Sequence, residues 1–504
     1  MLLTDEGLKN RVEWENKGYI LPKFDRQKVA EKTKAEPRWI HFGAGNIFRA
    51  FQANICQRLL DEEICDTGLI VAEGYDYEIV EKYNRPHDDL SILVTLRADG
   101  TVEKKVIGSI VESCILDEND QAEMDRLKEI FRAPLLQMVS FTITEKGYKT
   151  KEYMTKVTRL LLERYDNGKL PITFVSMDNC SHNGDKLKAA VVDIAEHFVK
   201  YGICGRDFVE YINDPEYVTF PLSMIDKITP RPDDKIADIL ASDGLEGGEP
   251  IITTKNTYVA PFVNAEETEY LVIEDLFANG RMPLEKGGVI FTDRESVDKT
   301  EKMKVCTCLN PLHTALAIFG CLLGYNKIHD EMQDATLRKL VTFLGKKEGM
   351  KVVVDPKVIS PDEFLDTVLE KRLSNPFMPD TPQRIACDTS QKIPIRFGET
   401  IKAYRSSSEL DTDDLVLIPT VLAGYLRYLD GVDDEGAEFT QSPDPMLDEL
   451  KEMSREDVLK RTDVFGVDLS EDSLASKVMA IYKKMCGKGN VRKALDNYVD
   501  TVLA

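Results

Sequence analysis

The sequence predicts an α/β fold in which a doubly wound, mostly parallel sheet is followed by a mainly α-helical C-terminal domain. Short β-rich runs alternate with helical stretches from residue 38 onward, which is typical of a parallel sheet covered by helices on both faces. After about residue 295, strand signals become sparse and helical periodicity dominates. The chain has 504 residues, which is too long for one ordinary core, so two or more domains are expected.

The expected strands are short runs rich in β-branched and aromatic residues. They are WIHFG (39–43), GLIVAEGY (68–75), LSILVTL (90–96), LLQMVSFTIT (135–144), ITFVSMD (172–178) and GGVIFTD (287–293). Helical patterns occupy 48–62 and 184–200, and later HTALAIFGCLLGY (313–325), ATLRKLVTFLG (335–345) and LVLIPTVLAGYLRYL (415–429). The predicted organisation is an N-terminal arm at 1–36, a Rossmann-type domain at 37–293 and a helical domain at 294–504.

Composition excludes several classes of protein. A formal net charge of −23 argues against binding to nucleic acid or to an anionic membrane surface. No uninterrupted apolar run reaches the roughly 18 residues of a membrane span, and the first residues carry charges where a signal peptide needs an apolar core. The ten cysteines are scattered apart from Cys306 and Cys308, whose spacing is not that of a zinc site. We therefore expect a cytoplasmic protein without a metal, which acts on a small molecule.

The first predicted strand ends in a glycine turn, GAGNIFR (43–49), that leads into an amphipathic helix. Gly43 and Gly45 allow the backbone to approach a pyrophosphate, and the N-terminus of the helix offers free N–H groups. Phe48 stands where the third glycine of such a fingerprint is usual, and Arg49 offers a bidentate phosphate donor. The alternative is an ordinary strand–helix turn. With Asn46 and Ile47, these residues form the predicted cofactor loop.

The next strand ends in VAEGYDYE (71–78), which places Glu73 or Asp76 where a dinucleotide's adenosine ribose is read. A carboxylate there accepts from both ribose hydroxyls and repels a 2′-phosphate, so we predict NAD rather than NADP. The alternative for each acid is a surface carboxylate at a strand end.

Further motifs make the chain similar to a known family. Together with GAGNIFRAF they are TITEKGY (142–148), SMDNCSHNGDKLK (176–188), FPLSMIDKITP (220–230), YLVIEDLFANGRMPLEKGGVIFTD (270–293) and LNPLHTAL (309–316). From about residue 38 to its end the chain resembles the mannitol dehydrogenase family, which includes mannitol 2-dehydrogenases, fructuronate (mannonate) reductases and tagaturonate (altronate) reductases. The resemblance implies an NAD-binding domain that includes Thr144 and Glu145, a helical domain, a reaction cleft between them, and hydride transfer without a metal.

The family motif is a lysine, four residues, asparagine, two residues and histidine. Asn310 and His313 match it, whereas Lys304 lies one position too early and Val305 holds the expected place. By resemblance, Lys304 is the acid/base, Asn310 and Asn179 stabilise the substrate oxygen, and His313 orients the substrate. The alternatives are a solvated lysine, a helix-capping asparagine and a satisfied core histidine.

A single π-type turn near 305–310 would absorb the extra residue before Asn310. Pro311 has no N–H, so an α-helical bond to the carbonyl of Thr307 is already lost there, and one more irregular turn costs little. Lys302 is the rival base, although it lies roughly 16 Å along a straight helix from His313.

Downstream, RIACDTSQKIP (384–394) keeps the family's arginine and lysine at Arg384 and Lys392. The resemblance implies that they bind the polar end of an open-chain sugar, with Arg396 as a further cation. Asp226 matches a family acid that could couple to the lysine or the histidine; its alternative is a turn or capping acid. Because a uronate needs cations, we favour D-mannonate and D-fructuronate over mannitol with fructose or altronate with tagaturonate. The alternative to an enzyme is a non-catalytic protein that binds NAD(H). The sequence does not predict the oligomeric state.

Overall fold

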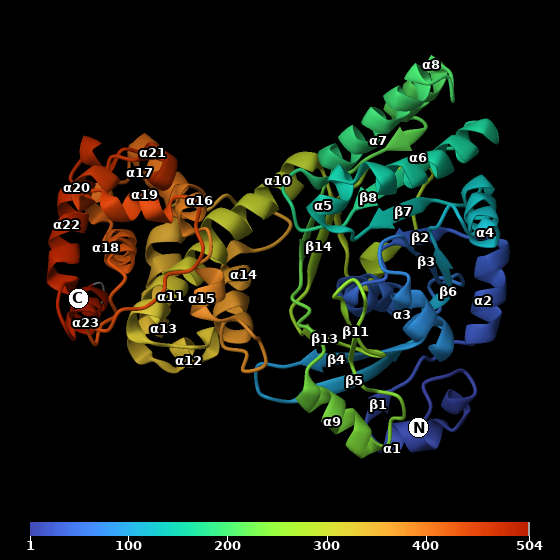
Figure 1. Ribbon diagram of the computed structural model, residues 1–504, viewed down its shortest axis with the longest axis horizontal. Coiled ribbons are helices and arrows are strands. Elements are labelled where there is room, and N and C mark those ends of the chain that lie inside the picture. The colour runs from blue at the N-terminus through green and yellow to red at the C-terminus, as the bar shows by residue number, and fades with distance from the viewer. Residues whose placement is uncertain (502–504) are drawn as a thin grey trace. The chain divides into compact units, whose positions relative to one another are not determined.

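The computed structural model describes residues 1–501, which divide into two compact units (Figure 1). Unit 1 comprises residues 1–97 and 101–298, and unit 2 comprises residues 98–100 and the described residues from 299 onward. The division falls within helix α10 (Arg294–Lys302).

The central element of unit 1 is a six-stranded sheet with the order β6-β3-β2-β7-β8-β9. Every neighbouring pair in it is parallel. The strands are β2 (Trp39–Phe42), β3 (Leu69–Glu73), β6 (Ile110–Ile115), β7 (Met138–Phe141), β8 (Ile172–Ser176) and β9 (Val218–Thr219). The strand order reverses between β2 and β7, and ligands of such sheets bind outside the carboxyl ends of the strands at that point. The predicted doubly wound sheet is confirmed.

Helices cover both faces of this sheet (Figure 1). Neighbouring residues of one strand face opposite sides, so Ile40 and Phe42 pack into one core cluster whereas Trp39 packs into the other. The helices of unit 1 are η1 (Gly7–Lys9), α1 (Arg11–Asn16), α2 (Arg26–Ala35), η2 (Phe48–Gln52), α3 (Ala53–Asp61), η3 (Val80–Asn84), η4 (Arg85–His87), α4 (Gln121–Arg132), α5 (Thr144–Lys149), α6 (Lys151–Asp166), α7 (Asn183–Lys200), α8 (Arg206–Asn213), α9 (Asp234–Asp243) and η5 (Leu284–Gly287).

Two of the expected strands pair outside the main sheet. β4 (Ser91–Leu96) lies in a mixed sheet of order β1-β5-β4-β13, and β15 (Ile290–Thr292) lies beside β14 in a sheet of order β10-β14-β15. The other strands are β1 (Tyr19–Ile20), β5 (Val102–Ile107), β10 (Ser223–Asp226), β11 (Ile251–Ile252), β12 (Tyr258–Val259), β13 (Phe262–Glu266) and β14 (Tyr270–Glu274). Alternation along the chain predicted β4 and β15 but not the sheets that they join, and it did not predict these other strands.

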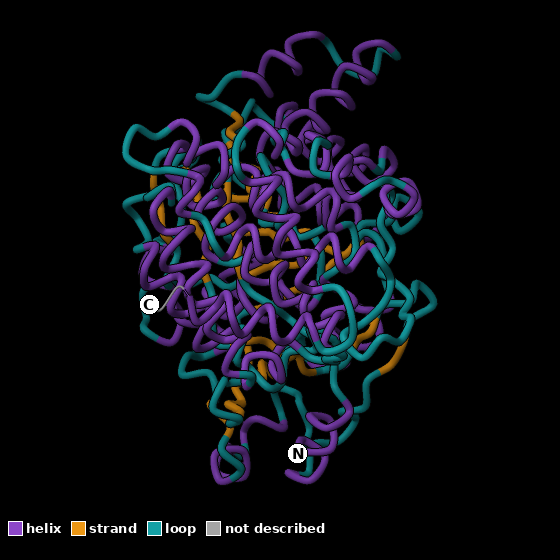
Figure 2. The backbone as a smooth tube through the Cα atoms, turned by 90° about the vertical axis from the view of Figure 1, so that its left-hand side faces the viewer, coloured by secondary structure: helices purple, strands orange, loops and turns teal. Residues whose placement is uncertain are grey.

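Unit 2 is helical (Figure 2). Several of its helical segments contain π turns, here η6, η7, η9 and η10. Helices α11 and α18 are buried along most of their length and form its core. The elements are η6 (Met303–Cys308), α11 (Asn310–Leu323), α12 (Ile328–Gln333), α13 (Ala335–Phe343), η7 (Leu344–Glu348), η8 (Gly349–Val352), α14 (Pro361–Thr367), η9 (Val368–Arg372), α15 (Pro382–Ile385), α16 (Thr389–Ile393), η10 (Pro394–Gly398), α17 (Glu399–Ser406), η11 (Thr412–Asp414), α18 (Leu417–Leu429), α19 (Leu447–Glu452), α20 (Arg455–Val458), α21 (Thr462–Phe465), η12 (Leu469–Glu471), α22 (Leu474–Met485) and α23 (Asn490–Thr501).

Two regions differ from the sequence-based picture. The first 36 residues pack into unit 1, where Trp14 is fully buried and donates to the carbonyl of Gly7 at 3.2 Å. The second region is the helical stretch Arg294–Leu323, which is long and apolar enough to cross a membrane by length and composition alone, although Asn310 and His313 interrupt its apolar residues. Its most apolar window is 72% buried inside the structure, as expected for a core helix.

Candidate active site

The glycine turn lies at the point where the strand order of the main sheet reverses. Gly43 has φ +106°, and a Cβ there would stand 2.5 Å from the carbonyl oxygen of Thr142, so only glycine fits. At Gly45 a Cβ would meet no atom within 4 Å, which leaves open space beside the turn. The helix begins at Asn46, so its first N–H groups follow the turn directly. The structure thus provides the cradle expected for a pyrophosphate.

Glu73, at the end of β3, binds the glycine turn. Its carboxylate accepts from the N–H of Ala44 at 2.8 Å, Tyr75 at 2.8 Å and Asp76 at 3.1 Å. Burial raises the pKa of Glu73, whereas these three hydrogen bonds lower it. The carboxylate therefore fixes the conformation of the glycine turn. This role is separate from the ribose contact that the sequence predicts for it.

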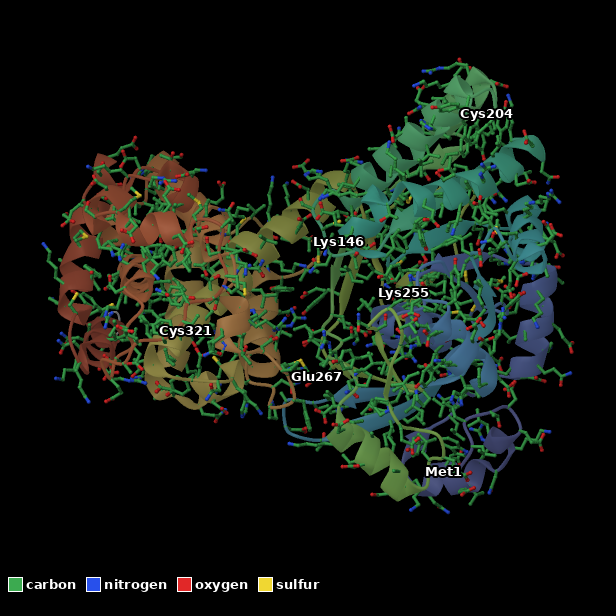
Figure 3. All side chains as sticks on the ribbon, in the orientation of Figure 1. Met1, Lys146, Cys204, Lys255, Glu267 and Cys321 are labelled. Carbon is green, nitrogen blue, oxygen red and sulfur yellow. The ribbon has the colours of Figure 1, made fainter. Side chains whose placement is uncertain are left out.

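A hollow of about 460 Å³ adjoins the end of β3 and receives residues from α6. Two buried polar atoms of its lining residues, Asp76 Oδ1 and the hydroxyl of Tyr153, have no hydrogen-bond partner among the described residues. The other oxygen of Asp76 accepts from Thr253 at 2.6 Å. Lys255 lies over the ring of Tyr75 at the edge of this hollow (Figure 3). The lining of the hollow is therefore mostly polar and charged, while these two unpartnered atoms are enclosed by the protein.

The residues after the turn are mostly committed to the protein. Arg49 is buried and donates to the carbonyl of Ala260 at 2.7 Å and to Asn46 Oδ1 at 2.9 Å. Burial lowers the pKa of Arg49 to about 10. Phe48 stacks on His41 with ring centroids 4.2 Å apart, and Ile47 packs against the same core. Arg49 therefore holds the loop in place. To bind a phosphate as predicted, its guanidinium would have to donate to the phosphate as well as to Ala260 and Asn46.

The adjacent strands β7 and β8 end in the next predicted residues. Thr144 has φ +65°, and its N–H donates to Asp178 Oδ1 at 2.8 Å while that of Ile143 donates to Asp178 Oδ2 at 3.1 Å. The hydroxyl of Tyr148 also donates to Asp178. Asn179 follows Asp178 and is exposed. The sheet therefore brings the cofactor loop and the predicted oxyanion residue into one hydrogen-bonded corner.

Glu145 lies beside Thr144 on α5, close to Lys149 at 3.1 Å and Lys186 at 3.4 Å. The hydrogen bond and charge of these lysines lower the pKa of Glu145, so it is ionised at neutral pH.

The corner is fixed to β10 through Asn183, a residue that the sequence analysis missed. Its amide nitrogen donates to the carbonyl of Asp178 at 2.9 Å and to the hydroxyl of Ser223 at 2.9 Å, and its oxygen accepts from the N–H of Ser223 at 3.0 Å. Asp226 ends the same strand and is buried. The sequence showed Asn183 only as part of the motif at 176–188, with no sign of these bonds.

In unit 2 the region before Asn310 contains the π turn that the extra residue predicted. Element η6 is π-helical, and the N–H of Leu309 donates to the carbonyl of Lys304 five residues earlier at 3.1 Å. The side chain of Lys304 is buried within this turn. Asn310 is the first residue of α11, and the capping position is Leu309, so the alternative of a capping asparagine does not hold.

His313, one turn into α11, faces charged residues from other elements. Its Nε2 lies 3.5 Å from Asp380 Oδ2 and makes no hydrogen bond within the described residues. Asp380 in turn pairs with Arg384. Burial lowers the pKa of His313 to about 4; Asp380 opposes this, and the charges of Arg396, Arg384 and Arg372 add to it. The imidazole is therefore neutral at physiological pH. The sequence analysis missed Asp380 and Arg372, although Asp380 lies four residues before Arg384, just ahead of the short helix α15.

The remaining cations brace the same region. Arg396 donates to the hydroxyl of Thr314 and, at 3.4 Å, to the carbonyl of Asn310. Burial lowers its pKa to about 10. Lys392 donates to the carbonyl of Ile385 at 3.0 Å and thereby caps α15, the helix of Arg384. The helices thus bring Asn310, His313, Arg384, Lys392 and Arg396 into one region of unit 2.

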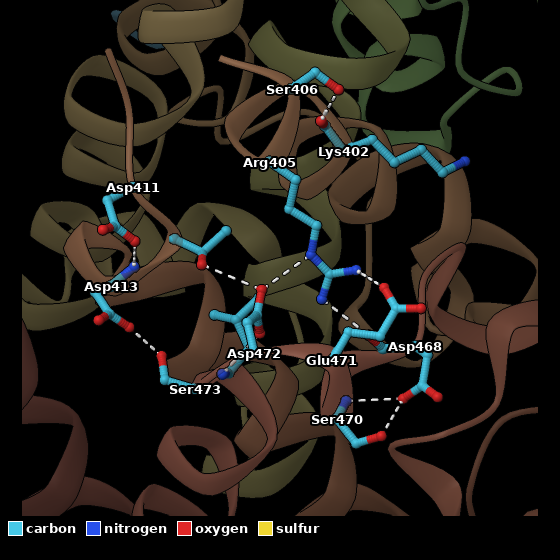
Figure 4. Close-up of polar contacts among 12 residues, drawn as sticks. Lys402, Arg405, Ser406, Asp411, Asp413, Asp468, Ser470, Glu471, Asp472 and Ser473 are labelled. Carbon is cyan, nitrogen blue, oxygen red and sulfur yellow. Dashed lines mark hydrogen bonds and ion pairs between the residues drawn. The ribbon is translucent and has the colours of Figure 1, made fainter. Parts of the chain in front are cut away.

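A hollow of about 410 Å³ in unit 2 is lined by charged residues that pair with one another. Arg405 pairs with Asp472 at 2.9 Å and Glu471 at 3.0 Å and donates to the carbonyl of Asp468 at 2.8 Å (Figure 4). These bonds hold α17 to η12, so this region is structural rather than a site.

Comparison with known proteins identifies the family. The Rossmann domain of mannitol dehydrogenase matches residues 37–286, and the mannitol dehydrogenase C-terminal domain matches residues 296–486. The chain belongs to the mannitol dehydrogenase family. The family predicted from the motifs is thereby confirmed, and with it an oxidoreductase built from a Rossmann domain and a helical C-terminal domain.

Relatives within and around this family match over almost the full length. A D-mannonate oxidoreductase of Thermotoga maritima is 48% identical, with 99% of each chain covered. A D-sorbitol dehydrogenase solved in substrate-free form has a TM-score of 0.80 and 27% identity, covering 95% of this chain and 97% of that one. The mannitol 2-dehydrogenase of Pseudomonas fluorescens, solved with NAD and D-mannitol, has a TM-score of 0.69 and 22% identity, covering 100% and 99%, and supports the fold.

Proposed function

We propose that this chain is an NAD-dependent oxidoreductase that interconverts D-mannonate and its keto form, D-fructuronate. The observation that carries the proposal is the full-length similarity at 48% identity to a D-mannonate oxidoreductase. The cluster of Arg372, Arg384 and Arg396 around His313 supports it, because a sugar acid brings a carboxylate that a neutral polyol lacks.

The residues of unit 1 fit a dinucleotide. The turn at Gly43 and Gly45, the open space beside Gly45 and the helix start at Asn46 suit a pyrophosphate, and the hollow beside Asp76 suits an adenosine. The carboxylate of Glu73 favours NAD over NADP by charge. Thr144 and Glu145 line the neighbouring loop. When bound, NAD accepts or supplies the hydride. Residues 37–293 would form this cofactor domain, and residues 294–504 the domain for the sugar acid.

Within unit 2 we assign the acid/base to Lys304. Oxidation of a secondary alcohol removes a proton from oxygen, and the amine Nζ of Lys304 would take it; in reduction the ammonium returns it. Asn310 and Asn179 each offer a carboxamide N–H to the charge that develops on that oxygen. Neutral His313 hydrogen-bonds a substrate hydroxyl through Nε2, which makes no hydrogen bond within the described residues. Asp226 couples to the lysine or the histidine. Arg384, Arg396 and Lys392 hold the uronate end.

The acidic chain would work in the cytoplasm on this small molecule, without nucleic acid, membrane or metal as partner. The test is the initial rate of NADH oxidation with D-fructuronate, D-tagaturonate, D-fructose and D-fructose 6-phosphate, with NADPH in parallel. We expect the highest kcat/KM with D-fructuronate and NADH. A preference for D-fructose would contradict the uronate assignment, and NADH binding without turnover of any of the four would favour a non-catalytic binding protein.

A further inference from the structure

Asp178 is a carboxylate with three donors and no role in the proposed chemistry. It lies two residues after β8, whose end pairs with the end of β7 at Phe141 and Ser176. One oxygen accepts from the N–H of Thr144 at 2.8 Å, and the other from that of Ile143 at 3.1 Å. The side chain is 8% exposed, so the carboxylate is held between the two strand ends rather than offered to solvent.

The backbone that Asp178 binds has an unusual conformation. Ile143 has φ −114° and ψ 5°, and Thr144 follows with φ +65°. Successive N–H groups of a right-handed and then a left-handed residue converge into a concavity that binds anions. A β-branched residue such as threonine rarely adopts a left-handed conformation, which persists only where surrounding contacts enforce it. Here the anion in the concavity is the protein's own carboxylate.

The other side of Asp178 is fixed as well. Its carbonyl oxygen accepts from Asn183 at 2.9 Å, and Asn183 is in turn bonded to Ser223 of β10. Asn179 is the next residue of the chain. One carboxylate therefore connects the loop of Thr144 and Glu145 to the residue that carries the proposed oxyanion donor.

We propose that Asp178 is a positioning residue: by filling the concavity of Ile143 and Thr144, it holds Thr144 left-handed and so shapes the loop that receives the dinucleotide. The proposal rests on the proposed function, because it assumes that this loop binds NAD. It assigns Asp178 no contact with the substrate.

The test is a double-mutant cycle between Asp178→Asn and Thr144→Gly, read out as the Kd for NADH without sugar and as kcat. The asparagine keeps the shape but presents an NH₂ to one of the two N–H donors. We expect Asp178→Asn to raise the Kd for NADH about tenfold. Glycine adopts φ +65° at no steric cost. In the Thr144→Gly background the same substitution should therefore change the Kd less than threefold.

Asp120→Asn is the matched control, because Asp120 caps α4 and asparagine caps helices equally well; it should leave the Kd for NADH unchanged. An equal penalty in both backgrounds, or a Kd within twofold of wild type for Asp178→Asn, would overturn the proposal. If Asp178→Asn does not fold, Tyr148→Phe replaces it in the cycle, because it removes one donor to the same carboxylate. A two- to threefold rise in the Kd for NADH that disappears in the Thr144→Gly background supports the proposal. A rise that does not depend on Thr144, or no rise at all, overturns it. Wild-type protein that does not bind NADH would refute the proposed function, whereas wild-type binding without the cycle's coupling refutes only the role of Asp178.

Discussion

The two units build their candidate sites in opposite ways. In unit 1 the groups come from backbone at the ends of parallel strands, and acidic side chains such as Glu73 and Asp178 hold that backbone in shape. In unit 2 the groups are side chains of helices, most of them basic, and π turns set their positions. A dinucleotide has a constant shape, which backbone N–H groups can match. A sugar acid differs from its relatives in charge, which side chains can select.

The largest effect on stability is expected where backbone alone makes the site. Gly43→Ala should lower the free energy of unfolding by at least about 1–3 kcal/mol, because φ +106° and the nearby carbonyl of Thr142 exclude a side chain. Gly45→Ala is the matched control: its methyl group enters open space, so stability should change by less than about 0.5 kcal/mol while NADH binds more weakly. Urea unfolding and NADH titration measure both. Equal losses of stability in Gly43→Ala and Gly45→Ala would contradict the claim that only Gly43 is required by the backbone.

In unit 2, where side chains make the site, the corresponding test removes the positive charge of one arginine. Arg396→Met should lower kcat/KM for D-fructuronate by roughly 100-fold, the cost of losing a buried partner of a carboxylate, and should affect D-fructose much less. Lys402→Met, an equal loss of charge on an exposed position of α17, should change neither rate. Similar losses for the acid and the neutral sugar would show that Arg396 only supports the fold.

Glu331 is a buried carboxyl of α12 that sits against α11, and neither of its oxygens has a hydrogen-bond partner among the described residues. Burial raises its pKa well above the usual value, with the charges of Asp334 and Asp330 adding to the effect. A raised pKa in the folded state means that its contribution to stability is complete at low pH and declines as pH rises past about 4.3, where the unfolded chain ionises. Glu331→Leu should therefore stabilise the protein by about 1–3 kcal/mol, more at pH 8 than at pH 5, in urea unfolding. A larger gain at pH 5 would contradict a buried neutral acid.

The smallest effect should come from deleting Val305. The deletion leaves four residues between Lys304 and Asn310, which is the family spacing, and should convert the π turn into ordinary α-helix. If the π turn only absorbs an inserted residue, kcat with D-fructuronate should stay within about tenfold of wild type. A loss of several hundredfold would show that the π turn itself sets the position of the lysine.

The contrast between the units also explains what could be predicted from the sequence. The glycine turn, the parallel sheet and the π turn follow from local spacing, and all three are present. The sheet that β4 joins depends on pairing with distant β13, which no local pattern encodes. Asp178, Asn183 and Asp380 were missed because each also has a partner far along the chain: Thr144, Ser223 and His313, respectively. The bond of Arg49 to the carbonyl of Ala260, far along the chain, could not be predicted from the sequence either.

The central claim is that the π turn leaves Lys304 as the base in spite of the inserted residue. The most direct measurement is turnover of D-fructuronate with NADH by Lys304→Ala and, as its control, Lys302→Ala. Loss of a general acid/base predicts a fall in kcat of about 100- to 10,000-fold for Lys304→Ala with an unchanged Kd for NADH, and near-wild-type kcat for Lys302→Ala. Near-normal turnover by Lys304→Ala, or the large loss in Lys302→Ala instead, would contradict the account.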